Sequence, residues 1–411
     1  MTKAAELAKM GEVLTNSQIG GRRNLFYNPK FDVAQRGTSF SKTTSAIYTL
    51  DRWQATSGSS FNLDTTITQS TTVPSGQGFK HSLKVEADSV VTPSGSDNGG
   101  ILQKLEQQDV EHLMYGTSDA KNLTLSFWVR SNKTGIYCVQ FQTNQGSSTA
   151  SEKYLHVKEY TISSANTWEK KTLIFPGHTV QAFNAAASNG EALRVNWWLA
   201  TGSDDHVSAD TWIQSGSFAS TSNQVNFMDS ADNEWYLCGC QLELSLKVTP
   251  FEHRSFGEEL ALCQRYYYRR TIGTSYVDYM PYAIAYGTTD IQGGIFHPVK
   301  MRASPSLVFS GVLRASQGNA VVTSSSGFGF TSVSTADSMV FYTHGGAFSG
   351  LTQFRGYSIY GNANDYMEVK SEFSGVSAIP ARMGLRSTYA IAAARAFSSS
   401  RAWLLNRLSQ K

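Results

Sequence analysis

Two segments of the chain have an apolar residue at every second position. This alternation constrains the fold more than any other feature of the sequence. Residues 123–130 place every second side chain, beginning with Leu123, on one face of a strand. Residues 193–199 repeat this pattern, with Leu193, Val195, Trp197 and Leu199 on the inner face. A period of two residues is typical of half-buried β-strands. Phe127 and Trp197 are therefore predicted to lie in a core.

Further strand patterns follow one another between residues 24 and 252. Residues 154–161, 170–175 and 235–244 have strand character, whereas 103–115 is the one segment that favours a short helix. Clusters of Gly, Ser, Asn, Asp and Pro separate the strand patterns. Short strands at this spacing, with no strong helical pattern between them, indicate an antiparallel β-sandwich or jelly roll.

At 411 residues the chain is too long for one ordinary core. We predict a mainly β protein in which an antiparallel β-sandwich or jelly-roll domain precedes a second, smaller β-sandwich, with short helices at the termini. The predicted parts are a helical N-terminal segment at 1–21, the first sandwich at 22–255, a helical linker at 256–270, a C-terminal β domain at 271–378 and a basic, helical tail at 379–411.

Two charged phrases receive structural roles in this scheme. Asp51-Arg52-Trp53 is interpreted as an arginine that pairs a carboxylate beneath a core tryptophan at the start of a strand. Glu258 and Glu259 suit the start of a linker helix, and its end is marked by basic residues that favour a helix C-terminus: Arg265, Arg269 and Arg270. The tyrosine-rich end of this helix is expected to run into a strand.

Composition narrows the classes of partner. Charged residues make up only 16% of the chain and the net charge is +3, whereas a dedicated nucleic-acid-binding protein normally has a stronger basic surface. We therefore predict no nucleic-acid partner. The start of the chain lacks the apolar run of a signal peptide, and no stretch approaches the roughly 20 apolar residues that span a bilayer. Synthesis in the cytoplasm is expected.

The cysteines predict neither a metal site nor a disulfide framework. Cys138, Cys238, Cys240 and Cys263 form no Cys-x-x-Cys pair, and the histidines do not cluster near them. Cys238 and Cys240 would share one face of a regular strand, but such neighbours fit disulfide geometry poorly, which favours buried thiols. No metal and no cofactor is predicted.

Six short phrases occur in order through the first two-thirds of the chain. They are Asn28-Pro29-Lys30-Phe31-Asp32 with Gln35-Arg36-Gly37-Thr38, then Asp51-Arg52-Trp53, Leu125-Ser126-Phe127-Trp128-Val129-Arg130, Asn166-Thr167-Trp168-Glu169-Lys170, Thr249-Pro250-Phe251-Glu252 and Cys263-Gln264-Arg265-Tyr266-Tyr267. Together they resemble the β-sandwich modules of bacteriophage tail-fibre and related virion surface proteins, which are similar to carbohydrate-binding modules. The resemblance covers residues 22 to 270.

This resemblance implies a structural, adhesive component of a phage particle and not an enzyme. It implies a homotrimeric tail-fibre or spike subunit that attaches to other virion proteins through its N-terminus and binds host cell-surface polysaccharide or another receptor. The expected location is the virion, at the tail or particle surface. Two alternatives stay open: a capsid decoration, head-fibre or tail connector protein without a receptor role, and a polysaccharide depolymerase.

The two ends of the chain show helical spacing. Residues 2–15 place Leu7, Ala8 and Leu14 on one stripe. A helix of this length is marginal alone and must dock on something; the resemblance makes it a virion anchor, and the alternative is a helix packed on its own sandwich or bundled with its copies. The basic tail either contacts a membrane or nucleic acid or, as we favour, is the solvated face of a helix that packs into an assembly.

The predicted glycan site consists of outward aromatic residues and a polar neighbour. Sugar recognition by β-sandwiches combines an aromatic ring that stacks on the pyranose with polar side chains that bind its hydroxyls. Trp128 and Trp198 have the outward phase, Trp212 follows the loop after Trp198, and Arg130 is a polar partner. The alternative for an outward tryptophan is contact with a neighbouring subunit.

No catalytic residue is predicted. Glycoside hydrolysis needs two positioned carboxylates, and acidic residues are sparse here. Asp204-Asp205 lies in a turn, where aspartate is common for backbone reasons, with a calcium-binding loop as the alternative. No motif of a serine hydrolase, zinc protease or phosphate-binding loop occurs, and no parallel β-helix repeat.

Overall fold

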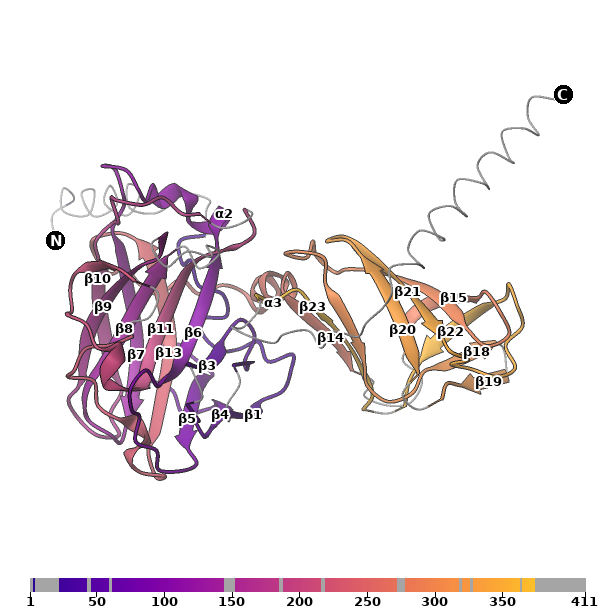
Figure 1. Cartoon of the computed structure of the whole chain (residues 1–411), viewed down its shortest axis with the longest axis horizontal. Helices are drawn as coiled ribbons and strands as arrows, with labels where there is room; N and C mark the ends of the chain where they lie inside the picture. The colour runs from indigo at the N-terminus through magenta and orange to yellow at the C-terminus, as the bar shows by residue number, and fades with distance from the viewer. Residues whose placement is uncertain are drawn as a thin grey trace. The chain divides into compact units, whose positions relative to one another are not determined.

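Residues 22–244 form two antiparallel sheets whose inner faces share one core (Figure 1). The computed structural model describes, besides Lys3, residues 22–42, 46–58, 61–143, 152–184, 188–215, 219–271, 278–317, 320–325, 328–362 and 364–373. The predicted anchor residues Leu7, Ala8 and Leu14 and the basic tail at 379–411 lie outside the described residues.

We call the two sheets of this sandwich sheet I and sheet II. Sheet I has six strands in the order β1 (Ser39–Lys42), β4 (Thr65–Ser70), β5 (Ser82–Ala87), β13 (Glu234–Leu244), β7 (Leu123–Ser131) and β10 (Glu169–Phe175). Sheet II has seven strands in the order β12 (Trp212–Gln214), β9 (Tyr154–Ile162), β8 (Gly135–Thr143), β11 (Glu191–Thr201), β6 (Asn98–Glu106), β3 (Gln54–Gly58) and β2 (Ile47–Tyr48).

The predicted inward phases of β7 and β11 are confirmed. Phe127 and Trp197 are fully buried, as are the other inward residues of both strands: Leu123, Leu125, Val129, Leu193, Val195 and Leu199. Trp53 lies between the two sheets with its ring centroid 5.5 Å from that of Trp197 and 4.9 Å from that of Phe31. Complete burial of side chains of this size contributes about 1.5–3 kcal/mol each, so this aromatic cluster is a main source of the sandwich's stability.

The helix predicted at 103–115 is only partly correct. Strand β6 continues to Glu106, because Gln103 and Leu105 pair with Val195 and Leu193 of β11. A single helical turn, α2 (Gln107–Val110), and a 3₁₀ turn at Glu111–Leu113 follow. The first four residues of the segment are therefore strand and not helix, because they pair with a neighbouring strand.

A second pair of sheets follows the helix α3 (Phe256–Gln264), and we call them sheet III and sheet IV. Sheet III has the order β14 (Tyr267–Thr271), β23 (Tyr366–Lys370) and β17 (Ser306–Phe309). Sheet IV has the order β19 (Ala320–Thr323), β18 (Arg314–Gln317), β22 (Gly356–Tyr360), β15 (Asp278–Ala285), β16 (Ile291–Phe296), β21 (Ser338–His344) and β20 (Gly329–Ser334).

Helix α3 begins as predicted and is followed by a strand, but it ends at Gln264, so Arg269 and Arg270 lie in β14 and not at the helix end. Ser255 caps the helix by accepting a hydrogen bond from the backbone N–H of Glu258, and the tyrosine-rich end continues into β14. The core of the second pair of sheets includes Ile295, Phe341 and Val369. The protein is thus mainly β, as predicted, with few short helices. No helix among the described residues has the length and apolar character needed to cross a membrane.

Four residues of the sequence phrases meet two carboxylates in a largely buried network, which we call the junction cluster. It consists of Arg36, Arg52, Arg265 and Tyr266 from the phrases, with Glu106 and Glu372 from outside them. The Glu106 carboxylate accepts two hydrogen bonds from Arg265, at 2.8 Å each, and one from the Tyr266 hydroxyl. Arg52 donates to Glu372 at 2.8 Å and lies 3.4 Å above the Tyr266 ring. The prediction that Arg52 pairs a carboxylate is confirmed, and these phrases serve the fold.

The cysteines are free and buried, as expected, but Cys238 and Cys240 do not share a face. Gly239 has a φ of +56°, and the pairing of β13 with β7 shifts register between Cys238 and Gln241. Cys238 pairs with Trp128 on the outer side, whereas Cys240 belongs to the core. A β-bulge therefore corrects the regular-strand expectation, since one extra residue reverses the direction of the following side chains.

Candidate functional site

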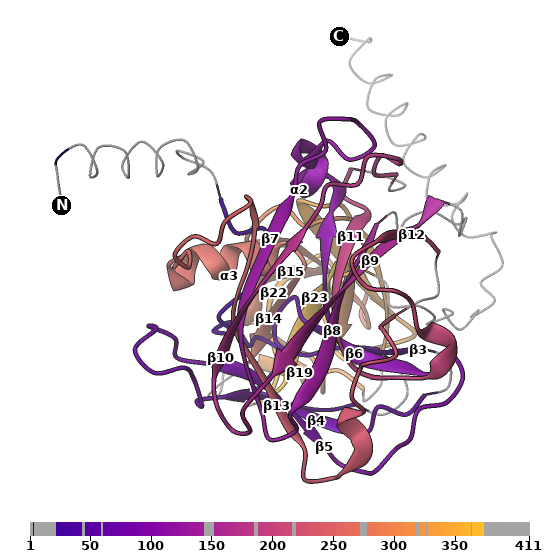
Figure 2. The ribbon, with the colours of Figure 1, turned by 90° about the vertical axis from the view of Figure 1, so that its left-hand side faces the viewer.

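The outer face of sheet I carries two of the predicted glycan-binding residues. Trp128 and Arg130 alternate with the buried residues of β7 and are half-buried on the side away from the core. Trp128 lies opposite Lys170 of β10 and Cys238 of β13, and Arg130 lies opposite Tyr236. Strands β10, β7 and β13 run side by side in sheet I (Figure 2). The sheet order therefore brings aromatic and cationic side chains from three strands together.

Trp128, Arg130, Trp168 and Tyr236 form what we call the aromatic platform. The guanidinium of Arg130 is 4.9 Å from the centre of the Tyr236 ring, and it donates hydrogen bonds to the backbone and side-chain oxygens of Asn166. The Trp168 ring meets the Tyr236 ring edge-on, with centroids 6.0 Å apart. The Trp168 indole N–H is shielded from solvent and meets no acceptor among the described residues.

Two acidic groups beside the aromatic platform share one lysine. Lys84 forms ion pairs with Glu86 and Glu234, each at 2.7 Å, and the Tyr236 hydroxyl donates to Glu234. Burial acts to lower the pKa of Lys84, but the hydrogen bonds to Glu234 and Glu86 outweigh it and raise that pKa overall. Lys170, by contrast, is exposed and has no ion pair with any described residue. The local balance of available charge is therefore positive.

A shallow depression of about 400 Å³ lies at the far end of β7. Its lining comes from the segment before β7 and from the end of β13, where Leu123 pairs with Leu244: Ser118, Asp119, Ala120, Lys121, Asn122, Leu244, Ser245 and Leu246. Asn122 accepts a hydrogen bond from the backbone N–H of Gly177 through its side-chain oxygen, so its amide N–H₂ is directed elsewhere. The depression thus lies at the opposite end of β7 from Arg130.

Trp198, a glycan-binding candidate because of its outward phase, is not on the solvent surface. Its phase is as expected, opposite to that of Trp197, but only 6% of the residue is exposed. The segment after β11 returns over sheet II, and Val207, Ile213 and Ala219 pack in the cluster that contains Trp198. The outer face of sheet II is covered at this point, so Trp198 has no free ring face for a sugar in this structure.

Trp212 occupies a third environment, on the edge strand β12 of sheet II. Its indole N–H donates to the carbonyl of Pro176 at 2.9 Å, and its ring packs against His156, His178 and Tyr115 with centroids 4.9 to 6.0 Å apart. Its polar edge is therefore occupied and one ring face is covered. Of the four predicted residues the structure brings together Trp128 and Arg130 on sheet I, and it separates both from Trp198 and Trp212.

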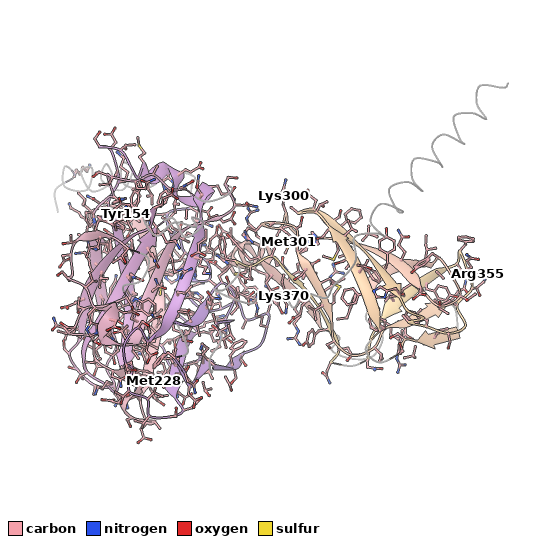
Figure 3. The ribbon with its side chains drawn as sticks, in the orientation of Figure 1. Tyr154, Met228, Lys300, Met301, Arg355 and Lys370 are labelled. Atoms are coloured by element: carbon pink, nitrogen blue, oxygen red, sulfur yellow. The ribbon has the colours of Figure 1, made fainter. Side chains whose placement is uncertain are left out.

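The histidines under Trp212 are buried and neutral. Burial lowers the pKa of His156 to about 4, with Lys158 adding to the shift, and burial alone lowers the pKa of His178 to about 4. Nε2 of His178 accepts a hydrogen bond from the backbone N–H of Gln181. The His178 ring centroid is 4.2 Å from that of Tyr154, which is labelled in Figure 3. Within the described ranges no group of three His, Cys, Asp or Glu side chains could hold a metal ion.

Asp205 has a local structural environment. Its carboxylate accepts a hydrogen bond from the Asn98 amide at 2.5 Å, and burial raises its pKa. The neighbouring turn is held by backbone hydrogen bonds from Gly202 to Asp97 and from Asp204 to Gly95. The pair lies in a turn, as predicted, but the described contact of the Asp205 carboxylate is to a side chain 107 positions away and not to the backbone of the turn.

Two residues of the aromatic platform, Trp168 and Tyr236, were missed by the site prediction. In the sequence Trp168 belongs to one of the short phrases, and Tyr236 lies within a predicted strand. The sequence does indicate that Tyr236, two residues before Cys238, points outward. That Tyr236 lies next to Arg130 follows only from the position of β13 beside β7 in the sheet. That adjacency joins strands more than 100 residues apart in the chain.

Comparison with known proteins gives likeness in fold and no family. No protein-family model and no curated protein matches the chain. Among solved structures, the enzymatically active domain of tailspike protein 4 from bacteriophage CBA120 is 12% identical, with a TM-score of 0.28 over 54% of this chain and 21% of that chain. A putative sugar-binding protein from Bacteroides thetaiotaomicron is 10% identical, with a TM-score of 0.33 over 54% of this chain and 100% of that chain. The xylan-binding domain CBM22-2 of Paenibacillus barcinonensis Xyn10C is 14% identical, with a TM-score of 0.28 over 50% and 99%.

Proposed function

We propose that this chain is a glycan-binding structural subunit of a bacteriophage particle, a tail fibre or spike, and that it acts by adhesion and not by catalysis. The observation that carries the proposal is the aromatic platform on sheet I. It combines half-buried aromatic rings, a guanidinium and an indole N–H without an acceptor among the described residues. The resemblance of the sequence phrases to phage fibre modules supports the virion assignment.

The geometry of the aromatic platform suits a sugar ring. A pyranose offers an apolar face to an aromatic ring and hydroxyls to the donors around it. Trp128 supplies the ring, while Arg130 has five N–H donors, of which two are used by Asn166. Such a site binds weakly alone, and several copies on one particle raise the avidity about 10²–10⁴-fold without new contacts. Adhesion by many weak sites therefore needs no deep pocket.

Replacing Trp128 with alanine is expected to lower affinity for host polysaccharide about tenfold or more, because the stacking surface is lost. The fold should persist, since Trp128 is half-buried and outside the core. The measurement is biolayer interferometry with purified host surface polysaccharide, with thermal unfolding as a check on the fold. Phe354→Ala is the control, because Phe354 is exposed in the second pair of sheets. Unchanged affinity in a folded Trp128→Ala protein would contradict the proposal.

The proposal includes a homotrimer, which the outer face of sheet IV supports. Ile284, Phe296 and Val333 are 54%, 85% and 67% exposed, and the strand registers place them on one face with Val340 and Tyr342. Among the described side chains that β15, β16, β20 and β21 direct to this face, none is Asp, Glu, Lys or Arg. A contiguous uncharged face of this kind marks an interaction surface, and every copy of the chain carries the same face.

The double substitution Phe296→Ser with Val333→Ser is expected to convert a trimer into monomers, because it removes the two most exposed apolar side chains of this face. Size-exclusion chromatography with light scattering measures the change. Val180→Ser is the matched control, since Val180 is equally exposed but lies on the first sandwich. A trimer that survives the double substitution would place the subunit interface elsewhere.

The position of the protein in the particle separates adhesion from the alternatives. Electron cryo-microscopy of the virion should find copies that project from the tail. Copies arrayed on the capsid or enclosed in the tail hub would favour the decoration or connector role, and release of reducing ends from host polysaccharide would favour a depolymerase.

A further inference from the structure

The carboxylates beside the aromatic platform take part in ion pairs, whereas two cations beside it form none with a described residue. Both carboxylates beside it, on Glu86 and Glu234, are bound by Lys84. Arg130 donates only to neutral oxygens of Asn166, and Lys170 has no ion pair with a described residue. Burial acts to raise the pKa of Glu234, but Lys84, Tyr236 and the charge of Arg130 together outweigh burial and lower that pKa. Lys170 has no anionic partner among the described residues, and Arg130 keeps N–H donors that Asn166 does not use.

These cations belong to a longer strip of the sheet I surface. Strand β10 exposes Lys170, Thr172 and Ile174 in turn on its outer side, and it ends beside the depression that Lys121 and Asn122 line. Alternate residues of a strand are about 6.6 Å apart, so the distance from Lys170 to Ile174 is about 13 Å before the depression is added. A strip with a cation at each end and hydroxyl and apolar groups between them matches an extended polymer better than a single sugar.

We propose that the ligand of this strip is an acidic polysaccharide, whose carboxylates are bound by Arg130 and Lys170 beside the ring stacked on Trp128. This inference rests on the proposed function and adds the chemical class of the glycan. The Arg130 fork has donors left for a carboxylate, and guanidinium–carboxylate hydrogen bonds are short and charge-assisted. The Trp168 ring lies at the same end, edge-on to the Tyr236 ring.

Ordinary solvated lysines would not produce the same arrangement. Exposed cations are usually interspersed with carboxylates, and an exposed pair contributes about 0.2–1 kcal/mol. Here Glu234 is held by Lys84 and by the Tyr236 hydroxyl. Burial acts to raise the pKa of Glu234, but these contacts, with the charge of Arg130, outweigh burial and lower it. Arg130 and Lys170 both lie on the outer face of sheet I, next to the half-buried ring of Trp128.

The test compares acidic polymers with the same polymers after chemical reduction of their carboxyl groups. Polygalacturonate, alginate and hyaluronate, and the reduced form of each, are titrated against the full chain at low and at high salt. We expect at least one acidic polymer to bind about tenfold more tightly than its reduced form, and high salt to remove most of this difference. The double variant Arg130→Gln with Lys170→Gln should bind both forms equally.

Lys300→Gln is the matched control, because Lys300 is exposed in the second part of the chain (Figure 3) and lies outside the strip. It should retain the full preference for the acidic polymer. If reduced and acidic polymers bind alike and Trp128→Ala weakens both, the charge inference is overturned while glycan binding stands. If no polymer binds and Trp128→Ala changes nothing for host polysaccharide either, the proposed function fails as well.

Discussion

Replacing Glu372 with glutamine is expected to lower the free energy of unfolding by about 3–5 kcal/mol. The Glu372 carboxylate pairs with Arg36 at 2.9 Å and with Arg52 at 2.8 Å, and the Arg52 side chain is completely buried. Glutamine keeps the shape but removes the charge, so a buried guanidinium loses its counter-ion. Removal of one partner from a buried pair is much more costly than loss of an exposed pair. Urea unfolding followed by tryptophan fluorescence measures the difference.

Glu86→Gln is the matched control for this prediction. It removes a carboxylate from an ion pair with Lys84 on the half-buried outer surface, and it should cost less than about 1 kcal/mol. A combined Arg52→Met and Glu372→Met protein should recover part of the loss, because no unpaired charge then remains. Equal stability of Glu372→Gln and Glu86→Gln would show that the junction cluster contributes little.

Acidification from about pH 7 to about pH 4.5 is expected to cost about 2 kcal/mol of unfolding free energy for each of His156 and His178. An unfolded histidine titrates near pH 6.5, whereas burial lowers both folded pKa values to about 4. Between these values the unfolded chain binds a proton that the folded chain does not. The stability contribution is therefore complete above about pH 6.5 and is lost as the pH falls toward 4.

The comparison of variants isolates this effect from other titrating groups. Burial raises the pKa of Asp51 and Glu259, which shifts stability in the opposite direction over part of the same pH range. We therefore expect His156→Gln and His178→Gln each to flatten the dependence of unfolding free energy on pH. His344→Gln, at an exposed position at the end of β21, should leave the wild-type slope. If both His156→Gln and His178→Gln kept the wild-type dependence of unfolding free energy on pH, the two histidines would not be the source of that dependence.

The core of the first sandwich could be predicted because its signal is local. Alternation along β7 and β11 alone assigned Phe127 and Trp197 to the interior, and both are fully buried. Trp198 has the opposite phase but is covered by a segment that returns over sheet II, and strand phase carries no information about such a cover. The error therefore concerns exposure and not direction.

Two of the four residues of the aromatic platform could be predicted from the sequence. Trp128 and Arg130 lie on one strand, so their shared face follows from spacing. Trp168 and Tyr236 join them through β10 and β13, and which strands flank β7 depends on the order of the sheet. In the same way, Arg52 was expected to pair a carboxylate, but its partner lies 320 positions later in the chain. A single sequence does not specify contacts of that range.

The junction cluster and the aromatic platform share no residue, and among the described residues no ion pair links them. Natural selection can therefore act on the two sets independently. Substitutions at Trp128 or Lys170 change a surface with little loss of stability, whereas a change at Arg52 or Glu372 endangers folding itself. Single substitutions on sheet I can in this way change the ligand that the proposed site binds, while the junction cluster keeps the fold.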